Sequence, residues 1–385
     1  MVLFLKGSVA ISDDYFNTIT EFKNGEIDRS NYGSNNHNCR FWAVISENVP
    51  DGVILNQLVV NPKSLKYLST QNVDGWGIAY YLDTSDSIGI VRGRIRANND
   101  PDYDLAVAHI DSLNPDIVLA HIRNCSSGCC CNGCDSIANP HPFLRFKNNE
   151  YWTFAHNGHI DKAVLYDLTG NDYLLENPPN GSNLPECDPA DTSLIIDSEL
   201  YFIYLLKSIE ESGWNVAEGI INAINDLVYP TIGGAYNFIL SNGSQIWAYR
   251  KGNTLFYFND TENNYCAVAS MFPDIETDNW QAVPNYGLAV FSSDAQPEFY
   301  DPLFVPGDVN GDKMVIGSDI TYGVAYFCGQ VSPPPDSFFI DGSWLYAAAD
   351  VNGNCEFLGS DIVYLVRYFQ GAGTAPIWCP QIQPY

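Results

Sequence analysis

The chain has 385 residues, enough for one large domain and a small one, and 46% of them are hydrophobic, enough to form a substantial core. Its 46 acidic and 18 basic residues give a net charge of -28, which disfavours nucleic acids and anionic lipids as partners and favours divalent cations. No run of about 18 apolar residues occurs, so the sequence predicts no membrane-spanning helix.

Four regions follow one another along the chain. Residues 1–38 are polar and end in a loop-like run, and we expect them to be a propeptide or leader segment. Residues 39–293 alternate short apolar runs typical of strands with helical patterns at 198–211 and 216–227. The predicted strands are 41–45, 76–82, 117–120, 152–155, 236–240, 246–249, 255–258 and 266–269. Strands clustered at both ends with helices between them indicate a layered α+β domain.

Residues 294–306 contain three prolines and are predicted to be a linker to a module at 307–385. That module is an internal repeat, because GSDITYGVAYF at 317–327 recurs as GSDIVYLVRYF at 359–369. Each copy follows a DVNG segment and predicts one helix, and we expect a thin apolar face formed by Ile320, Val324, Phe327, Ile362, Val366 and Phe369.

The two repeats each open with a loop rich in oxygen ligands. Calcium prefers six to eight oxygens, and a loop with ligands at positions 1, 3, 5, 7 and 12 wraps them around one point. The predicted ligands are Asp308, Asn310, Asp312, Met314 (through its carbonyl) and Asp319 in the first loop, and Asp350, Asn352, Asn354, Glu356 and Asp361 in the second. An Asp/Asn-rich turn before a helix would explain one loop but not a matched pair.

The paired loops resemble the dockerin family over residues 307–370. This resemblance implies a small α-helical domain that depends on Ca²⁺ and docks to a cohesin-like protein partner. The sixth loop position, usually glycine, is Lys313 in one loop and Cys355 in the other, and the second loop has fewer carboxylates, so we expect the first site to be tighter.

A second set of motifs is spread over the larger domain. It comprises CRFWA at 39–43, DGWG at 74–77, AHIRNCSSG at 120–128, NPHPF at 139–143, WTFAHNG at 152–158, DSE at 197–199 and AVAS at 267–270. In order and spacing, the set resembles the class II glutamine amidotransferases, in particular the stand-alone branch of γ-glutamyl amide and peptide hydrolases. That resemblance implies the four-layer αββα sandwich of the N-terminal nucleophile hydrolases.

The resemblance also implies roles for individual residues. Cys39 matches the nucleophile, whose own α-amino group acts as the base once it is the first residue. Asn157 and Gly158 match the oxyanion hole, Arg123 the clamp on the substrate α-carboxylate, and Asp197 the carboxylate that receives the α-ammonium. The remaining predicted substrate-binding positions are Ser126, His141 and His156.

Each residue also has an ordinary structural interpretation. Cys39 could be a buried strand cysteine, Asn157 and Gly158 a hairpin turn, and Arg123 a surface ion-pair residue. Because residues 1–38 block the α-amine, we expect cleavage between residues 38 and 39. The resulting expectation is hydrolysis of glutamine or a γ-glutamyl amide, with two alternatives: a glutaminase subunit that feeds a separate synthase, or an unprocessed scaffold.

The chain has 11 cysteines, five of them crowded into residues 125–134. Cys131 and Cys134 could bind zinc or form a disulfide. With a calcium module that suggests export, we expect disulfides and an extracellular or cell-surface location, although no clear signal peptide is present.

Overall fold

A computed structural model describes residues 39–82, 88–124, 141–179, 196–228, 235–273, 279–284, 287–293, 296–300, 305–312, 314–335, 337–340, 343–374 and 376–377. The predicted leader 1–38, Ser126 and the cysteine cluster at 125–134 lie outside the described residues.

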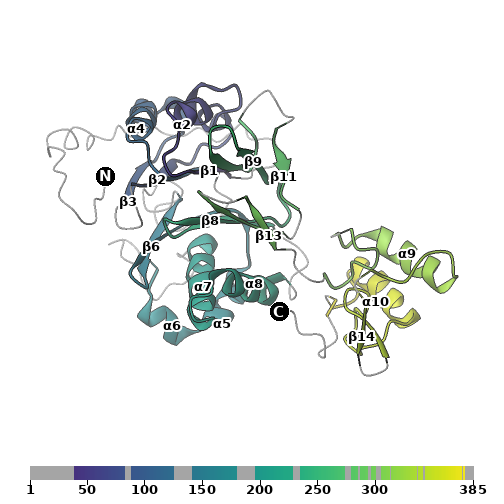
Figure 1. Cartoon of the computed structure of the whole chain (residues 1–385). Helices are drawn as coiled ribbons and strands as arrows, with labels where there is room; N and C mark the ends of the chain where they lie inside the picture. Colours follow the sequence, from purple (N-terminus) through teal and green to yellow (C-terminus); the bar gives the residue numbers. More distant parts are fainter. Residues whose placement is uncertain are drawn as a thin grey trace, which may run out of the picture.

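Two antiparallel sheets form the middle of the larger domain (Figure 1). The first, in the order β11-β9-β10-β1-β4-β2-β3, contains β1 (Arg40–Ile45), β2 (Trp76–Tyr81), β3 (Ile88–Gly93), β4 (Ile117–Ile122), β9 (Phe256–Asp260), β10 (Tyr265–Ala269) and β11 (Gln281–Ala282). The second, in the order β13-β12-β8-β7-β6-β5, contains β5 (Phe143–Lys147), β6 (Glu150–His159), β7 (Ala235–Ser241), β8 (Gln245–Tyr249), β12 (Leu288–Ser292) and β13 (Glu298–Tyr300).

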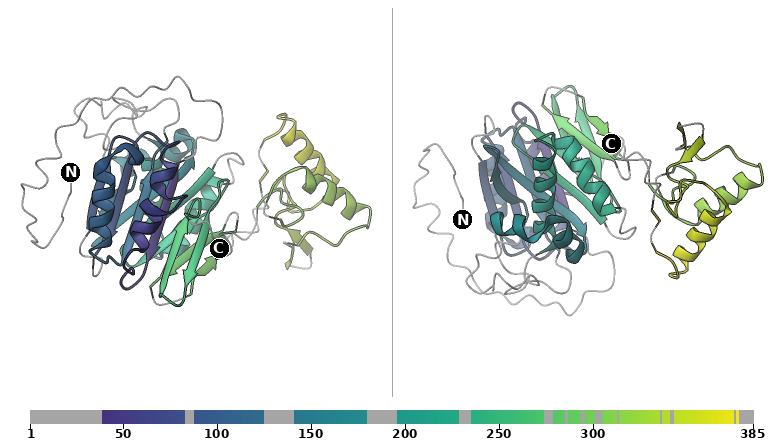
Figure 2. Two further views of the ribbon diagram at one scale, coloured as in Figure 1. Left: turned by 90° about the horizontal axis from the view of Figure 1, so that it is seen from above. Right: turned by 90° about the horizontal axis from the view of Figure 1, so that it is seen from below.

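Helices cover the outer faces of both sheets, as the two views of Figure 2 show. Over the first sheet lie α2 (Val53–Leu55), η2 (Asn56–Val60), α3 (Leu65–Leu68), η3 (Ala97–Asn99) and α4 (Pro101–Asp111). Over the second lie α5 (Lys162–Thr169), α6 (Asn171–Glu176), α7 (Asp197–Glu211) and α8 (Val216–Val228). The predicted four layers are therefore present.

Strand alternation explains why the layers hold together. In β1, Trp42 and Val44 point into the apolar core beneath the α2–α4 helices, whereas Phe41, Ala43 and Ile45 point into the core between the sheets. All five side chains are almost fully buried. A strand buried on both faces reads as a continuous apolar run, which is why this strand was predictable from sequence.

The predicted linker at 294–306 needs correction. Residues Glu298–Tyr300 form β13, which pairs with β12 through Leu288 and Tyr300, so the second sheet extends beyond residue 293. The prolines at 297 and 302 suggested a linker, but they flank the three residues of β13 and leave their backbone groups able to pair at a sheet edge.

The repeat predicted a purely helical C-terminal module, and the structure shows that this prediction is wrong. Between α9 (Gly317–Phe327) and α10 (Gly359–Phe369) lies an antiparallel hairpin of β14 (Ser337–Ile340) and β15 (Ser343–Tyr346). The module forms a separate body beside the sandwich (Figure 1). Cys355 is disulfide-bonded, whereas Cys328 is a free, exposed thiol.

The predicted apolar face of this module is also partly wrong. Val324, Phe327 and Phe369 are 49%, 46% and 41% exposed. The helix α9 instead turns Gly323 inward, where a side chain would collide with Ile362, so the two helices approach through a glycine. The module's core comprises Val309, Ala349, Val351, Phe357, Ile362 and Leu365.

No helix within the described residues is long and apolar enough to cross a membrane.

Candidate active site

Strand alternation brings the predicted nucleophile and the predicted carboxylate clamp to the same place. Cys39 directly precedes β1 and lies two residues from Phe41, and Arg123 directly follows β4 and lies two residues from His121. Because side chains two residues apart on a strand point to the same face, both belong to the face between the two sheets. The register pairs Arg40 with Ile122, which places Cys39 and Arg123 at the same end of the first sheet.

The second sheet brings Asn157 to that end. Asn157 has the parity of Ala155, which packs between the sheets. Far from this end, the Tyr81 hydroxyl donates to the Tyr151 carbonyl over 2.8 Å, whereas His121 Nε2 lies 3.3 Å from the His156 carbonyl oxygen. These contacts align the strands, so the end of β6 faces the start of β1.

Cys39 is half-buried, and its sulfur contacts Asn124. The Asn124 N–H donates to Sγ over 3.4 Å, and Sγ lies 3.5 Å from the Asn124 carbonyl oxygen. Burial raises the pKa of the Cys39 thiol; the Asn124 N–H and the charges of Arg123 and Arg40 oppose that shift, while the charge of Asp197 adds to it. Arg123 and Asp197 are therefore both within electrostatic reach of the thiol.

Arg123 is buried at 6% exposure, which argues against the surface ion-pair interpretation. Its backbone is fixed to the DGWG turn, because its N–H donates to the Gly75 carbonyl over 2.8 Å and its carbonyl accepts from the Asp74 N–H over 3.1 Å. Gly75 has φ of 108°, a left-handed conformation that glycine adopts without strain. The glycine of this motif thus positions the arginine.

Asp197 is the first residue of α7, where a carboxylate is stabilised by the helix dipole. Its Oδ1 accepts from the Ser198 N–H over 2.9 Å, and its Oδ2 accepts from the Ile160 N–H over 3.0 Å. Burial alone would raise the pKa of this carboxyl, but the hydrogen bonds from His159 and from the Ile160 N–H hold the pKa below its usual value. Asp197 is therefore ionised at neutral pH.

The predicted histidines lie beneath the site rather than open to it. His156 and His141 are 1% and 3% exposed. His156 Nδ1 lies 2.9 Å from Ser198 Oγ, beside Asp197, and His141 Nδ1 lies 2.8 Å from His121 Nε2. Burial lowers the pKa of all three imidazoles, so each is neutral. His121 was not predicted, because nothing in the spacing of the sequence indicates that it meets His141.

Room for His141 comes from Gly77. A side chain at Gly77 would collide with the His141 carbonyl oxygen, so the second glycine of DGWG admits this segment between the sheets. Within the described residues, His121 Nδ1 and His141 Nε2 have no hydrogen-bond partner.

Asn157 and Gly158 lie in β6 and pair with Asn237 and Tyr236 of β7, so the hairpin-turn interpretation is wrong. The Asn157 side chain is 1% exposed. A side chain at Gly158 would collide with the Ala235 carbonyl oxygen, so only glycine lets the two strands approach here.

The two loops of the C-terminal module have the same hydrogen bonds. Asp308 Oδ1 accepts from the Gly311 and Asp312 N–H groups over 2.8 and 2.9 Å. In the second loop, Asp350 Oδ1 accepts from the N–H groups of Gly353 and Asn354 over 2.9 and 3.3 Å. The duplicated sequence therefore folds into duplicated loops.

The last loop carboxylates, Asp319 and Asp361, are held alike. Their Oδ2 atoms accept over 2.8 Å from the N–H groups of Ile316 and Leu358, respectively. Asp308, Asp319, Asp350 and Asp361 all have 0% exposure. In the part of the chain that the structure describes, no three His, Cys, Asp or Glu side chains gather as a metal-binding group. The predicted calcium ligands therefore combine these carboxylates with side-chain amide and backbone carbonyl oxygens, which such a group does not include.

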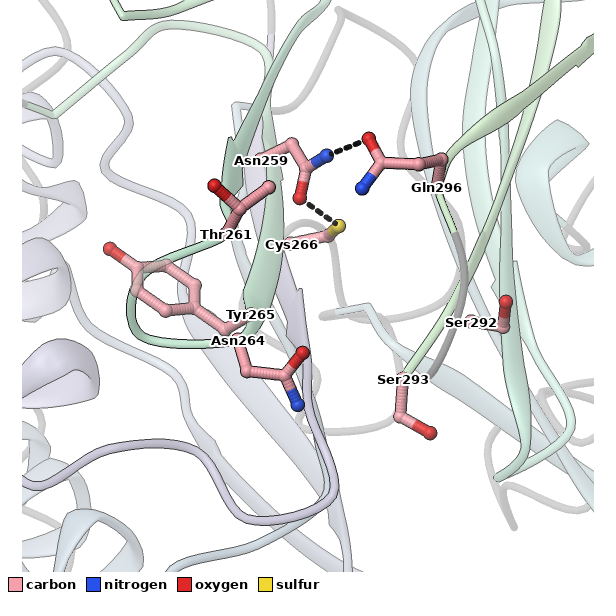
Figure 3. Close-up of a pocket in the computed structure, with 8 residues that line it drawn as sticks. All are labelled: Asn259, Thr261, Asn264, Tyr265, Cys266, Ser292, Ser293 and Gln296. Carbon is pink, nitrogen blue, oxygen red and sulfur yellow. Dashed lines mark hydrogen bonds between the residues drawn. The ribbon is translucent and has the colours of Figure 1, made fainter.

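One pocket of about 260 Å³, shown in Figure 3, is lined by residues at the far end of β1 from Cys39. Its lining is polar and comes from both sheets. Asn259 Nδ2 donates to Gln296 Oε1 over 2.7 Å, and the Cys266 thiol donates to Asn259 Oδ1 over 3.3 Å. Cys266 pairs with Ile45 at the far end of β1, so this pocket is remote from Cys39.

Comparison with known proteins bears on the larger domain. The family "Glutamine amidotransferases class-II" matches residues 57–262, more than half of the chain and a range that includes Arg123, Asn157, Gly158 and Asp197. An uncharacterized protein of Methanocaldococcus jannaschii is 30% identical over 207 residues, 52% of this chain and 49% of that protein. The chain thus spans about half the length of that relative. A Haemophilus influenzae protein named "Putative glutamine amidotransferase" is 27% identical over 248 residues, 57% of this chain and 74% of that protein.

Two solved structures are similar at lower identity. The glutamine phosphoribosylpyrophosphate amidotransferase of B. subtilis has a TM-score of 0.44 at 16% identity, over 68% of this chain and 49% of that one. A glutamine aminotransferase class-II domain protein from Silicibacter pomeroyi has a TM-score of 0.42 at 17% identity, over 68% of this chain and 99% of that one. On the family match over residues 57–262, the chain belongs to the class II glutamine amidotransferases.

Proposed function

We propose that the larger domain hydrolyses the γ-carboxamide of glutamine, or a γ-glutamyl amide or peptide, through a thioacyl intermediate on Cys39. The observation that carries this proposal is the joint presence of Arg123 and Asp197 within electrostatic reach of the Cys39 thiol. A buried cation and a half-buried anion near one nucleophile match a zwitterionic α-amino acid whose side chain extends to the sulfur.

The two charges would hold the amino-acid end of the substrate. The Arg123 guanidinium can bind the α-carboxylate with two parallel hydrogen bonds. Asp197 would receive the α-ammonium through oxygens already ordered by Ser198 and Ile160. An amide lacking either group would lose affinity, because it would lose the charge-assisted hydrogen bonds to Arg123 or to Asp197.

The chemistry at Cys39 needs a proton acceptor. Burial raises the pKa of the thiol, and the three neighbouring histidines do not contact it in the described structure. After cleavage before Cys39, the α-amine, with an ordinary pKa of about 7.7–8.0, lies beside the thiol and can accept its proton.

The thiolate then attacks the γ-carbonyl carbon to form a C–S bond. The Asn157 amide and the Gly158 N–H would stabilise the oxyanion. Collapse of this tetrahedral intermediate breaks the C–N bond and leaves a thioester, and the amine or ammonia departs with the proton that the α-amine had accepted. Water then attacks the thioester, which breaks the C–S bond, releases glutamate and restores the thiol.

Two alternatives make different predictions for the protein itself. A glutaminase subunit would release ammonia only slowly until a synthase is added, and an unprocessed scaffold would keep residues 1–38. Intact mass spectrometry combined with glutamate release from glutamine and from γ-glutamyl anilides separates them. A chain that starts at Cys39 and releases glutamate unaided supports hydrolysis; an uncleaved, inactive chain supports the scaffold.

We further propose that the two loops of the C-terminal module bind Ca²⁺. Burial raises the pKa of Asp319, Asp350 and Asp361, so these carboxylates are desolvated without full compensation of their charge. A bound divalent cation would supply that compensation. Cys355, at the sixth loop position, has φ of 67°, the turn that glycine usually makes there. Docking to a cohesin-like partner belongs to this proposal, and the disulfide at Cys355 supports an extracellular or cell-surface location.

A further inference from the structure

We infer that Asn253 is a positioning residue that orients the Asn157 amide toward the oxyanion. This inference rests on the proposed function, since it concerns how that site is held in shape. Asn253 lies in the turn between β8 and β9 and has no place among the motifs that the sequence suggested.

Asn253 decides which way the Asn157 amide faces. Its Nδ2 donates to the Asn157 backbone carbonyl over 2.9 Å and lies 3.3 Å from Asn157 Oδ1. Two amide N–H groups cannot face each other favourably, so the Asn157 oxygen must point to Asn253 and its NH₂ away from it. Within the described residues, no acceptor takes the Asn157 Nδ2 hydrogens, which leaves both for a ligand.

The turn that carries Asn253 is itself fixed by Asn237, a neighbour of Asn157 across the β6–β7 pair. Asn237 Oδ1 accepts from the Lys251 and Asn253 N–H groups over 2.9 and 3.3 Å. Its Nδ2 donates to the Asn253 and Thr254 carbonyls over 3.0 and 3.2 Å. Asn237 itself is fully buried, so its end of these four bonds is shielded from water.

The same turn is tied to the strand of the nucleophile. The Thr254 hydroxyl donates to the Ser270 carbonyl over 2.7 Å. The Ser270 N–H donates to the Phe41 carbonyl over 3.0 Å, and the Phe41 N–H donates to Ser270 Oγ over 3.1 Å. Phe41 is two residues from Cys39. The turn at 251–254 therefore links the oxyanion donor in one sheet to the nucleophile in the other.

The expected consequence is specific to the transition state. Charge develops on the γ-carbonyl oxygen only during the reaction, and a donor that is already oriented costs no reorganisation at that moment. Misorienting the Asn157 amide should therefore lower kcat by about 100-fold, the scale of losing one oxyanion donor, with little change in KM.

The test is Asn253→Asp with Asn259→Asp as the matched control. In N253D a carboxylate replaces the donor, so Asn157 should turn its NH₂ toward residue 253 and its oxygen toward the oxyanion. N259D makes the same change in the remote polar pocket, where the carboxylate can still accept from Cys266 (Figure 3). Should N253D be unstable, Asn253→Ser removes both bonds to Asn157 without adding charge.

Kinetic and alkylation measurements on the full protein test the inference. We expect kcat for glutamate release to fall about 100-fold in N253D and to stay within about twofold in N259D, with KM and the inhibition constant of glutamate unchanged in both. Alkylation of Cys39 by iodoacetamide, which needs no oxyanion donor, should proceed at the wild-type rate. A loss shared by kcat, KM and alkylation alike would indicate a merely structural role and would overturn the inference.

A further readout, the NMR spectrum, is also independent of turnover. The side-chain amide resonance of Asn157, assigned by its absence in Asn157→Ser, should shift in N253D and stay in place in N259D. If the wild-type protein hydrolyses no γ-glutamyl amide, the proposed function fails. The Asn157 resonance would still show whether Asn253 orients the Asn157 amide. An Asn157 resonance that is unchanged in N253D overturns the inference.

Discussion

His159 Nδ1 lies 3.2 Å from Asp197 Oδ2, so an exposed imidazole covers the carboxylate that would bind the substrate ammonium. The bond to Asp197 raises the pKa of His159 above its ordinary value of 6.5, while partial burial, Asp161 and Lys162 make smaller contributions of both signs. Protonated His159 therefore competes with a cationic ligand for Asp197.

The first prediction concerns this competition. The His159 charge is present at low pH and is lost as pH rises through its raised pKa, so KM for glutamine should fall as pH rises from 6 to 8. For an exposed pair we expect a change of about two- to fivefold. His159→Gln should abolish this dependence of KM, whereas His109→Gln, at an exposed and remote histidine of α4, should retain it. A KM profile that is equally steep in H159Q would show that another group titrates.

Replacing the nucleophile should separate chemistry from folding. Cys39→Ala should abolish glutamate release, because only the Sγ atom is lost, while the thermal unfolding midpoint stays close to that of the wild type. Cys266→Ala, at a buried thiol whose pKa is raised to about 11 by burial, serves as the control and should keep its activity. Residual turnover near wild type in C39A would remove Cys39 from the mechanism.

Arg123→Lys should lower kcat/KM for glutamine by about 100-fold, because a point charge replaces a bidentate fork in a desolvated site. The loss should disappear with a γ-amide substrate that lacks the α-carboxylate. Arg94→Lys is a suitable control at an arginine outside the site. Equal losses with both substrates would mean that Arg123 supports the fold through its contacts with the DGWG turn.

Calcium binding can be measured directly on the full chain by titration calorimetry. We expect two sites, with Asp308→Ala weakening binding more than Asn354→Ala, because it removes a carboxylate from the loop with more of them. Asp260→Ala, at an acidic residue outside the loops, should bind as the wild type does. Absence of binding heat at millimolar calcium would end the calcium proposal.

The raised pKa values in the loops predict a further pH effect. A carboxyl whose pKa is higher in the folded state binds more protons there, so folding of the chelated module should become more favourable as pH falls from 7 toward 5. Added calcium should reverse this trend, since the cation stabilises the ionised carboxylates. Thermal unfolding of the full chain with chelator and with calcium, at both pH values, checks the sign.

Much of the sandwich was predictable because its central strands are buried on both faces. β1, β4 and β10 read as apolar runs, whereas β5 at a sheet edge contains Arg145 and Lys147 and was missed. The helix α4 was also missed, although Asp100 caps it and Pro101 begins it, because its apolar residues form only a weak stripe.

The candidate site was predictable only in part. Motifs nominated Cys39, Arg123, Asn157 and Asp197 as candidates, since each sits in a distinctive local sequence. Asn253 follows a Lys-Gly pair that suggests only a turn, and its role comes from hydrogen bonds to strands far away in the chain. Long-range polar contacts of this kind leave no periodic pattern in a sequence.

The layer between the sheets makes the proposed active site sensitive to changes in the core. Cys39 belongs to one sheet and Asn157 to the other, and the core between them includes the alanines Ala43, Ala155 and Ala248 among larger side chains. Adding two methyl groups at such a position, as in Ala155→Val, would push the sheets apart by a fraction of an ångström. Turnover would then depend on the spacing of the two sheets, and the thermal unfolding midpoint should fall as well, because overpacking a close-packed core is destabilising.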